Sequence, residues 1–211
     1  MLDLGSEDGS HIRSVLHGTA ISPKNVYVAD INPEAVAAAA RRFGFTPVVI
    51  GEQGRLPFPD GFFDIVYCSS VIEHVTVPKD RVWELRSGGE FRRRSAERQK
   101  SFASEVERLS RQYYVQTPNK WFPIESHTWL PFLGWLPRRL LVPVLRFTNR
   151  FWVKKTEPDW NLLDEATMSL LFEGADITHE RTLGLSKSVI ALRSTKPTTC
   201  SDAAGLTNGS T

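Results

Sequence analysis

The stretch LDLGSEDG, residues 2–9, decides the fold of this 211-residue chain. It begins as a short apolar run that ends at Gly5, and Gly9 follows four residues later. Apolar residues at helical spacing then recur between Ser10 and His17. A buried strand, a glycine turn and a helix, in this order, are the opening unit of a parallel sheet covered by helices. The sequence therefore predicts an α/β protein.

The alternation of strands and helices continues outward from this unit. We predict buried strands at residues 26–29, 47–50, 62–68 and 113–116, and a helix from Pro33 to Phe43 that is capped by Asn32. A charged helical stretch covers 86–111, and 177–183 pairs antiparallel with 188–192 at the edge of the sheet. These elements form a doubly wound, mostly parallel sheet with a C-terminal antiparallel strand. We expect one domain over 1–194 and a disordered tail over 195–211, which is rich in Ser, Thr, Gly and Ala.

A segment of different composition interrupts this pattern at residues 121–160. It holds all of the tryptophans except Trp83, and Pro123, Pro131, Pro137 and Pro143 exclude one straight helix. No acidic residue occurs between Leu130 and Val153, whereas arginines and lysines are frequent up to Lys155. We predict an inserted, helical, Trp-rich lobe.

Composition excludes several classes of protein. A formal net charge of +2 does not by itself indicate a nucleic-acid partner, and no run of about 18 apolar residues is present. The N-terminus lacks the basic and apolar regions of a secretory signal. Cys68 and Cys200 cannot make a disulfide framework or a four-ligand zinc site, so we predict no metal and a cytoplasmic location.

Polar features follow three successive strands where a parallel sheet binds ligands. They are the loop 5–9, Asp30 and Glu52. A dinucleotide fingerprint that starts at Gly5 would need glycines where Glu7 and Ser10 stand. The acidic loop would also repel a pyrophosphate, whereas it suits a cationic nucleoside without phosphate. The sequence therefore points to S-adenosylmethionine.

Four segments in order resemble the motifs of class I S-adenosylmethionine-dependent methyltransferases, and most closely the group that methylates small molecules and lipids. They are LDLGSEDG at 2–9, VADINP at 28–33, LPFPDGFFDIV at 56–66 and SSVIEHV at 69–75. The resemblance covers residues 1–120, and the terminal strand pair fits the last two strands of the family. It implies a Rossmann-like fold and S-adenosylmethionine as the cofactor.

The resemblance also implies roles for individual residues. The methionine and ribose pocket would be shaped by Asp3, Gly5 and Gly9, and the ribose hydroxyls bound by Asp30. Glu52 would approach the adenine amino group beside a backbone contact from Gln53, and Ser69 would lie below the methionine end. The chain departs from the family at Glu7, which replaces the central glycine of the loop. It also starts at the first cofactor strand, without the extra residues and the helix that usually precede it.

Two histidines are the candidates for catalysis. Methyl transfer depends on positioning the acceptor and excluding water, and a hydroxyl acceptor also needs a base. His74, which follows the fourth strand, and His127, with Glu125 as its orienting partner, lie on loops expected at the cofactor face. A structural hydrogen bond to the adjoining loop is the alternative for His74.

The Trp-rich lobe is expected to choose the acceptor. It is either a hydrophobic lid over a small-molecule or lipid-like acceptor or a peripheral membrane contact through 129–155, and a lipid acceptor allows both. The Asn-Pro-Pro-Tyr signature of nucleic-acid base methylation is absent after the fourth strand, where Ser69 to Ile72 stand, so we expect no nucleic-acid partner. The alternatives are a macromolecular acceptor and a degenerate, non-catalytic cofactor-binding domain, which the Glu7 departure favours.

Overall fold

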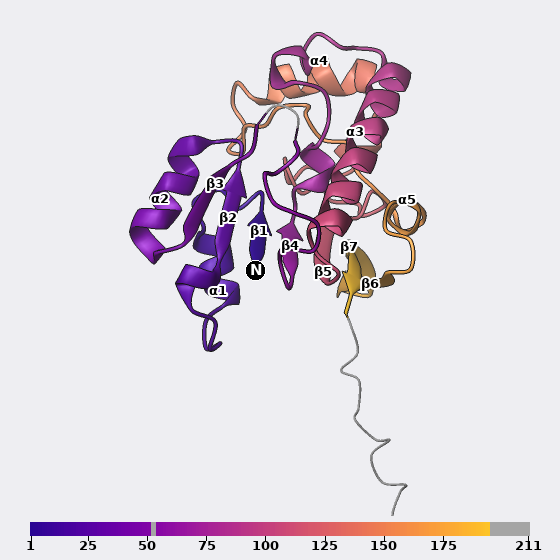
Figure 1. Ribbon diagram of the computed structural model, residues 1–211. Coiled ribbons are helices and arrows are strands. Elements are labelled where there is room, and N and C mark those ends of the chain that lie inside the picture. Colours follow the sequence, from indigo (N-terminus) through magenta and orange to yellow (C-terminus); the bar gives the residue numbers. More distant parts are fainter. Residues whose placement is uncertain (52–53, 195–211) are drawn as a thin grey trace, which may run out of the picture.

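The architecture is a twisted sheet between two layers of helices, as the computed structural model shows for residues 1–51 and 54–194 (Figure 1). The strand order is β3-β2-β1-β4-β5-β7-β6. The first five strands are parallel, and β7 runs antiparallel to both β5 and β6. The strands are β1 (Leu2–Leu4), β2 (Tyr27–Asp30), β3 (Thr46–Val49), β4 (Val66–Ser69), β5 (Tyr113–Pro118), β6 (Asp176–Thr182) and β7 (Leu185–Arg193). This topology confirms the Rossmann-like fold class.

The helices cover both faces of the sheet. They are α1 (Ser10–Val15), α2 (Pro33–Phe43), α3 (Gly88–Leu109), α4 (Arg138–Thr148) and α5 (Glu165–Leu171), with short 3₁₀ turns η1 (Pro23–Asn25), η2 (Ile72–His74), η3 (Lys79–Arg81) and η4 (Leu133–Trp135). Val28 of β2 packs in one core cluster with residues of α1 and α2, whereas its neighbour Ala29 packs in another with residues of α3 and α5. Side chains of a strand alternate between faces, so the sheet is wound on both sides.

Local sequence signals explain where α2 begins and ends. The Asn32 side chain accepts hydrogen bonds from the backbone N–H groups of Glu34 and Ala35, and Pro33 occupies the first helical position. Gly44 ends the helix with a φ of 75°, a conformation that favours glycine. The predicted helix over 33–43 is therefore confirmed with its cap.

The fourth strand is shorter than the sequence predicts. We expected a strand over 62–68, but β4 covers only Val66–Ser69. The rings of Phe62 and Phe63 instead pack against Phe58 and Tyr27, with centroids between 4.9 and 6.1 Å apart. A run of apolar residues looks the same in sequence whether it pairs in a sheet or fills an aromatic cluster. The prediction for Phe62 to Ile65 was therefore wrong.

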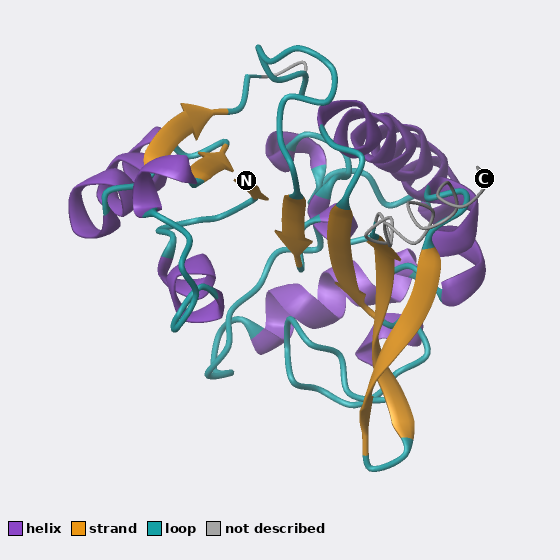
Figure 2. Ribbon diagram, turned by 60° about the horizontal axis from the view of Figure 1, so that its bottom comes forward, coloured by secondary structure: helices purple, strands orange, loops and turns teal. Residues whose placement is uncertain are grey.

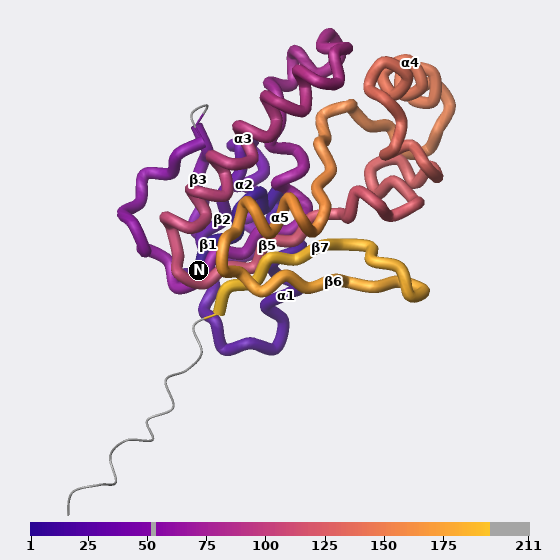
Figure 3. The backbone as a smooth tube through the Cα atoms, turned by 90° about the vertical axis from the view of Figure 1, so that its right-hand side faces the viewer, coloured from indigo at the N-terminus to yellow at the C-terminus, as the bar shows by residue number. Residues whose placement is uncertain are grey.

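The C-terminal strands form a long hairpin that extends beyond the rest of the sheet (Figures 2 and 3). This pair confirms the antiparallel edge that the sequence predicts. The expected tail over 195–211 lies outside the described residues. None of the helices in the described part of the chain is long and apolar enough to cross a bilayer.

The Trp-rich lobe is helical, with α4 at its centre and η4 before it, and α4 lies at the upper end of the molecule in Figure 1. As predicted, the lobe is not one straight helix. Pro137 stands at the N-cap of α4, whereas Pro143 lies inside α4, which continues through it. Arg138 ties the lobe to the core. Its guanidinium donates to the backbone oxygens of Val82, Leu85 and Pro158 and lies over the Phe91 ring.

Candidate active site

The loop between β1 and α1 requires glycine at two places. Gly5 has a φ of 77°, and a Cβ atom there would lie 2.3 Å from Cγ2 of Val71. Gly9 has a φ of 74°, and its Cβ would lie 2.9 Å from that of Ala39. Both positions combine a left-handed backbone with close neighbours, so the loop keeps its path only with glycine.

Asp30 holds this loop against the end of β2. Its Oδ2 accepts the backbone N–H of Glu7 at 3.0 Å, and its Oδ1 accepts that of Asn32 at 2.9 Å. Glu7 adopts a φ of 47°, so the backbone takes a glycine-like conformation although a side chain is present. The Glu7 side chain is exposed. Replacement of the central glycine therefore leaves the left-handed turn of the loop in place.

Two buried polar groups at this loop fit a cationic nucleoside. Asp3 of β1 is only 4% exposed, and burial, followed by the nearby charge of Asp30, raises the pKa of its carboxyl to about 7. The buried Ser6 hydroxyl has no hydrogen-bond partner among the described residues. A positively charged ligand would favour the ionised form of Asp3, and a ligand with hydroxyl or amino groups would satisfy Ser6. The residues present therefore fit S-adenosylmethionine.

Ser69 lies at the end of β4 and contacts a residue that sequence reasoning missed. Its hydroxyl donates to Oε1 of Gln116 on β5 at 2.9 Å, and the Ser70 hydroxyl donates to the same oxygen at 3.1 Å. A polar residue near the carboxyl end of a strand could have marked Gln116 in the sequence. The other two predicted cofactor residues, Glu52 and Gln53, lie outside the described residues.

A cavity of about 250 Å³ opens beside this strand end. The Trp-rich lobe forms one wall, and the ends of β4, β5 and β7 form the others. The lining residues are Ser70, Gln116, Pro118, Asn119, Phe122, Ile124, Glu125, Ser126, Trp129, Gly134, Leu162, Lys187 and Ser188. Apolar and polar side chains both line it, which is the usual composition of a small-molecule site.

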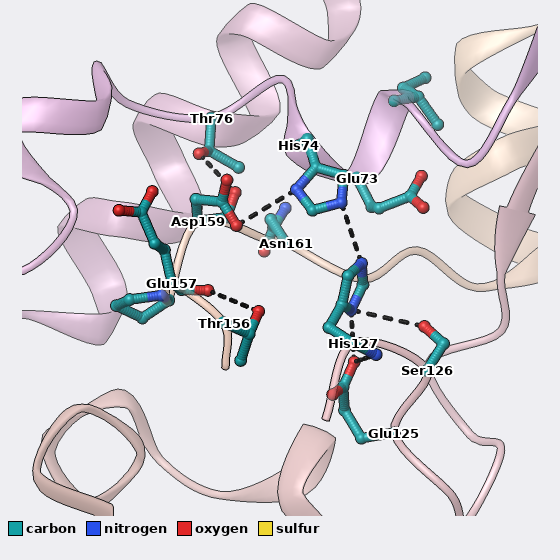
Figure 4. A network of polar contacts seen from close by, with 12 residues as sticks. Glu73, His74, Thr76, Glu125, Ser126, His127, Thr156, Glu157, Asp159 and Asn161 are labelled. Atoms are coloured by element: carbon teal, nitrogen blue, oxygen red, sulfur yellow. Dashed lines mark hydrogen bonds and ion pairs between the residues drawn. The ribbon is translucent and has the colours of Figure 1, made fainter. Parts of the chain in front are cut away.

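The two candidate catalytic histidines lie next to each other (Figure 4), and Glu125, which contacts His127, also lines the cavity. Nε2 of His74, in η2, lies 3.0 Å from Nε2 of His127, which comes from the loop after β5. The His127 ring stacks on buried Trp160 at 4.9 Å, which fixes its plane. The fold thus joins two rings that are 53 positions apart in the sequence.

A carboxylate orients each ring through Nδ1. His74 Nδ1 lies 3.2 Å from Oδ1 of Asp159, and His127 Nδ1 contacts Oε1 of Glu125. Burial opposes ionisation of both carboxyls, but the hydrogen bonds and charges of the histidines outweigh it, so the pKa of each carboxyl is lowered. Burial likewise opposes protonation of His74, but its bond to Asp159 raises the pKa overall. The contact between His127 and Glu125 agrees with the sequence analysis, whereas Asp159 was not predicted.

Glu73 is a second residue that the sequence analysis did not select. Its side chain is completely buried, and burial raises the pKa of its carboxyl. Oε2 accepts the Thr117 hydroxyl at 3.0 Å, whereas Oε1 has no partner among the described residues. It stands directly before His74 in the IEH sequence of η2, so its place beside a candidate base was the available signal.

Comparison with known proteins agrees with this geometry. Residues 2–87, which span the glycine loop, Asp30 and η2, match the family model described as a methyltransferase domain. This segment of the chain is therefore similar to a methyltransferase domain, and the fold is the one that S-adenosylmethionine-dependent methyltransferases have. No curated protein matches the sequence.

Solved structures of methyltransferases share the fold of this domain. An S-adenosylmethionine-dependent methyltransferase from Mesorhizobium loti superposes with a TM-score of 0.53 at 16% identity, over 90% of this chain and 88% of that one. Another from Clostridium acetobutylicum has a TM-score of 0.51 at 11% identity, over 90% and 81%. These similarities cover a larger part of the chain than the residues that match the family model.

Proposed function

We propose that this methyltransferase transfers a methyl group from S-adenosylmethionine to a small-molecule or lipid-like acceptor. The observation that carries the proposal is the cavity of about 250 Å³ between the end of β4 and the Trp-rich lobe. Its volume suits one small acceptor or the reactive end of a lipid. The wall made by Trp129 and Ile124 favours an acceptor with an apolar portion.

Different residues of the domain bind the cofactor and orient the acceptor. Bound S-adenosylmethionine supplies an activated methyl group. Gly5 and Gly9 leave room for it, Asp30 accepts hydrogen bonds from the ribose hydroxyls, and Asp3 places a negative charge near its cationic end. Because the donor is already activated, the chain contributes mainly by orienting the acceptor and excluding water.

The histidine pair takes the proton when the acceptor is a hydroxyl. Glu125 both lines the cavity and contacts His127, so the pair borders the acceptor space. Asp159 and Glu125 stabilise a positive charge on the rings once a proton arrives. This arrangement of a base and an orienting carboxylate is typical of general-base catalysis.

The outer surface of the lobe supports a lipid-like acceptor. Several large apolar side chains between 129 and 155 are more than half exposed, up to 91% for Val153. Arginines and lysines without neighbouring acids accompany them in the sequence. Exposed aromatic and basic side chains together favour the surface of an anionic bilayer. We include in the proposal that this surface contacts the membrane in which the acceptor lies.

A labelling experiment tests the proposed function. The full chain is incubated with isotope-labelled S-adenosylmethionine and a cell extract, and the lipid, small-molecule and macromolecular fractions are analysed by mass spectrometry. We expect label in a lipid or small molecule, and much less label with the Asp30→Ala variant when the cofactor is not saturating. Label confined to protein or nucleic acid would contradict the acceptor class. Tight cofactor binding without any labelled product would support the non-catalytic alternative.

A further inference from the structure

The histidine pair has an electrostatic problem that a bound cation would solve. A carboxylate can only accept a hydrogen bond, so Nδ1 of His74 and Nδ1 of His127 each carry the hydrogen toward Asp159 and Glu125. In a neutral ring this leaves a lone pair on Nε2. The two Nε2 atoms lie 3.0 Å apart, so two lone pairs face each other. Such a contact is stable only with a positive ion between the rings, either a proton or a metal ion.

A third donor group lies at the same place. One ligand atom each from Glu73, His74 and His127 lie within 4.8 Å of one another. Glu73 is completely buried, and its Oε1 has no partner among the described residues. A buried carboxylate oxygen is costly unless it is paired or coordinates a metal. Glu125 and Asp159 add two further carboxylates around the rings. Lys79 and Arg138 lie near Asp159, and Lys154 donates to the backbone oxygen of Ser126 beside His127.

We propose that Glu73, His74 and His127 form a binding site for a divalent transition metal ion, with Zn²⁺ as the best match. Two imidazoles and one carboxylate are a ligand set that zinc takes in sites with an open fourth position. Each histidine ligand donates its other N–H to a carboxylate, which is the usual outer contact of such ligands. This differs from the sequence analysis, which gave no metal, because His127 lies 53 positions from His74 and only the fold brings it to the adjacent pair Glu73 and His74.

The distances require only small adjustments. In a tetrahedral site with Zn–N bonds of about 2.0–2.1 Å, the two nitrogens lie about 3.3 Å apart, close to the observed 3.0 Å. The His74 side chain is 35% exposed and that of His127 is 13% exposed, so an ion can reach the site from solvent. If the proposed function holds, the ion would replace the histidine pair as the group that promotes proton loss, because both Nε2 atoms would then be ligands. The ion would bind an acceptor oxygen at the open position and ease the loss of its proton.

Metal binding is tested directly, without reference to methyl transfer. The full chain is stripped with a chelator and titrated with ZnCl₂ by calorimetry, and Co²⁺ is added separately to record its visible absorption. We expect one Zn²⁺ per chain and the intense band of four-coordinate Co²⁺. Affinity should fall more than about 100-fold in His74→Ala and His127→Ala and about 10- to 100-fold in Asp159→Asn, which removes only an outer contact.

The matched control is His179→Ala. His179 also pairs with a carboxylate, Glu165, at 3.2 Å, but it lies on β6 away from the cluster. Its loss should leave Zn²⁺ affinity unchanged. Circular dichroism checks that each variant is folded. If a variant is not folded, the Co²⁺ spectrum of the wild-type chain tests the metal site instead. Absence of stoichiometric binding by the folded wild-type chain, or undiminished binding by both histidine variants, would show that the rings share only a proton. Either result is independent of whether a methylated product is found.

Discussion

The backbone N–H of Glu7 donates a hydrogen bond to Oδ2 of Asp30 over 3.0 Å, and Glu7 makes this bond in a left-handed conformation with a φ of 47°. The bond joins the cofactor loop to the residue expected to bind the ribose. A side chain at positive φ costs free energy that glycine avoids. The bond to Asp30 therefore holds the strained backbone of Glu7 in place, next to the bonds that Gly5 and Ser6 donate to the Ala29 oxygen.

Glu7→Gly should relieve this strain. We expect the free energy of unfolding, measured by urea denaturation, to rise by about 1 kcal/mol. Glu7→Ala removes the same carboxylate but keeps a side chain at positive φ, so it should show no such gain. An equal gain in both variants would assign the effect to the carboxylate and not to the backbone.

Asp30→Ala should weaken cofactor binding through the ribose. Hydrogen bonds to a charged group contribute about 1.5–3 kcal/mol, so calorimetry should show an affinity for S-adenosylhomocysteine lower by roughly 10- to 100-fold. A ribose-dideoxy analogue should bind the wild-type chain about equally weakly and lose little more in the variant. Asp80→Ala, an exposed aspartate on η3, is the control. Independent losses from the two changes would contradict the ribose assignment.

Asp3 should make cofactor binding depend on pH. Its pKa of about 7 in the free domain means that it is protonated at pH 5, whereas a bound cation favours the ionised form. Binding then releases a proton, and affinity should rise as pH increases from 5 to 7 and level off above 8. Asp3→Asn should remove this dependence. A flat profile for the wild-type chain would place the cationic end of the cofactor elsewhere.

The same carboxyl should make stability depend on pH in the opposite direction. Burial raises its folded pKa above the ordinary value of 3.8, so the folded chain holds a proton that the unfolded chain has lost. Its contribution is therefore present below about pH 4 and is lost as pH rises through 7. In the absence of cofactor, Asp3→Asn should be more stable than the wild-type chain at pH 8, and the difference should shrink at pH 4.

Two glycines separate backbone strain from steric overlap. Gly5 and Gly18 both have positive φ, 77° and 80°, but only at Gly5 would a Cβ meet a neighbour within 4 Å. Gly18→Ala should lower the free energy of unfolding by about 1 kcal/mol. Gly5→Ala should cost about 1–3 kcal/mol more, because Val71 must move. Similar losses of unfolding free energy in the two variants would mean that the Val71 side chain can move away at no cost.

The exposed surface of the lobe should bind anionic liposomes. We expect the full chain to co-sediment at about 0.01 M salt and to be released at about 1 M, where charges are screened within a few ångströms. The double variant Phe147→Ser, Phe151→Ser removes two side chains that are 61% and 63% exposed and should bind more weakly. Leu183→Ser, at a position 98% exposed on the β6–β7 turn, is the control. No co-sedimentation of the wild-type chain at low salt would exclude the membrane contact.

Sequence reasoning succeeded where the physical cause is local. Asn32, Pro33 and Gly44 fix the ends of α2 through caps that a few neighbouring residues provide. The mostly parallel sheet and its antiparallel edge were predicted from the alternation of apolar strands with helices. The strand prediction was wrong at Phe62 and Phe63 because of tertiary packing. Their rings pack against those of Phe58 and Tyr27 in an aromatic cluster.

The candidate site shows the same division. His74 and His127 could be chosen from their places after predicted strands, but nothing in the sequence shows that their Nε2 atoms meet. Asp159 lies 85 positions from His74, and only the folded lobe brings it within 3.2 Å. The sequence does not show that Glu73 is buried, because glutamate side chains are usually exposed. Long-range packing, which has no linear pattern, therefore determines the centre of the site.

The residues around the two candidate catalytic histidines come from two different segments of the chain. Glu73 and His74 belong to the segment that matches the methyltransferase family model, whereas His127, Glu125 and Asp159 belong to the inserted lobe. A recombination that exchanged the lobe for one with another acceptor preference would separate the two rings. We therefore expect new acceptor specificity to arise more readily by single substitutions in the cavity wall than by exchange of the whole lobe. An exchanged lobe would also have to supply residues that contact His74 as His127 and Asp159 do.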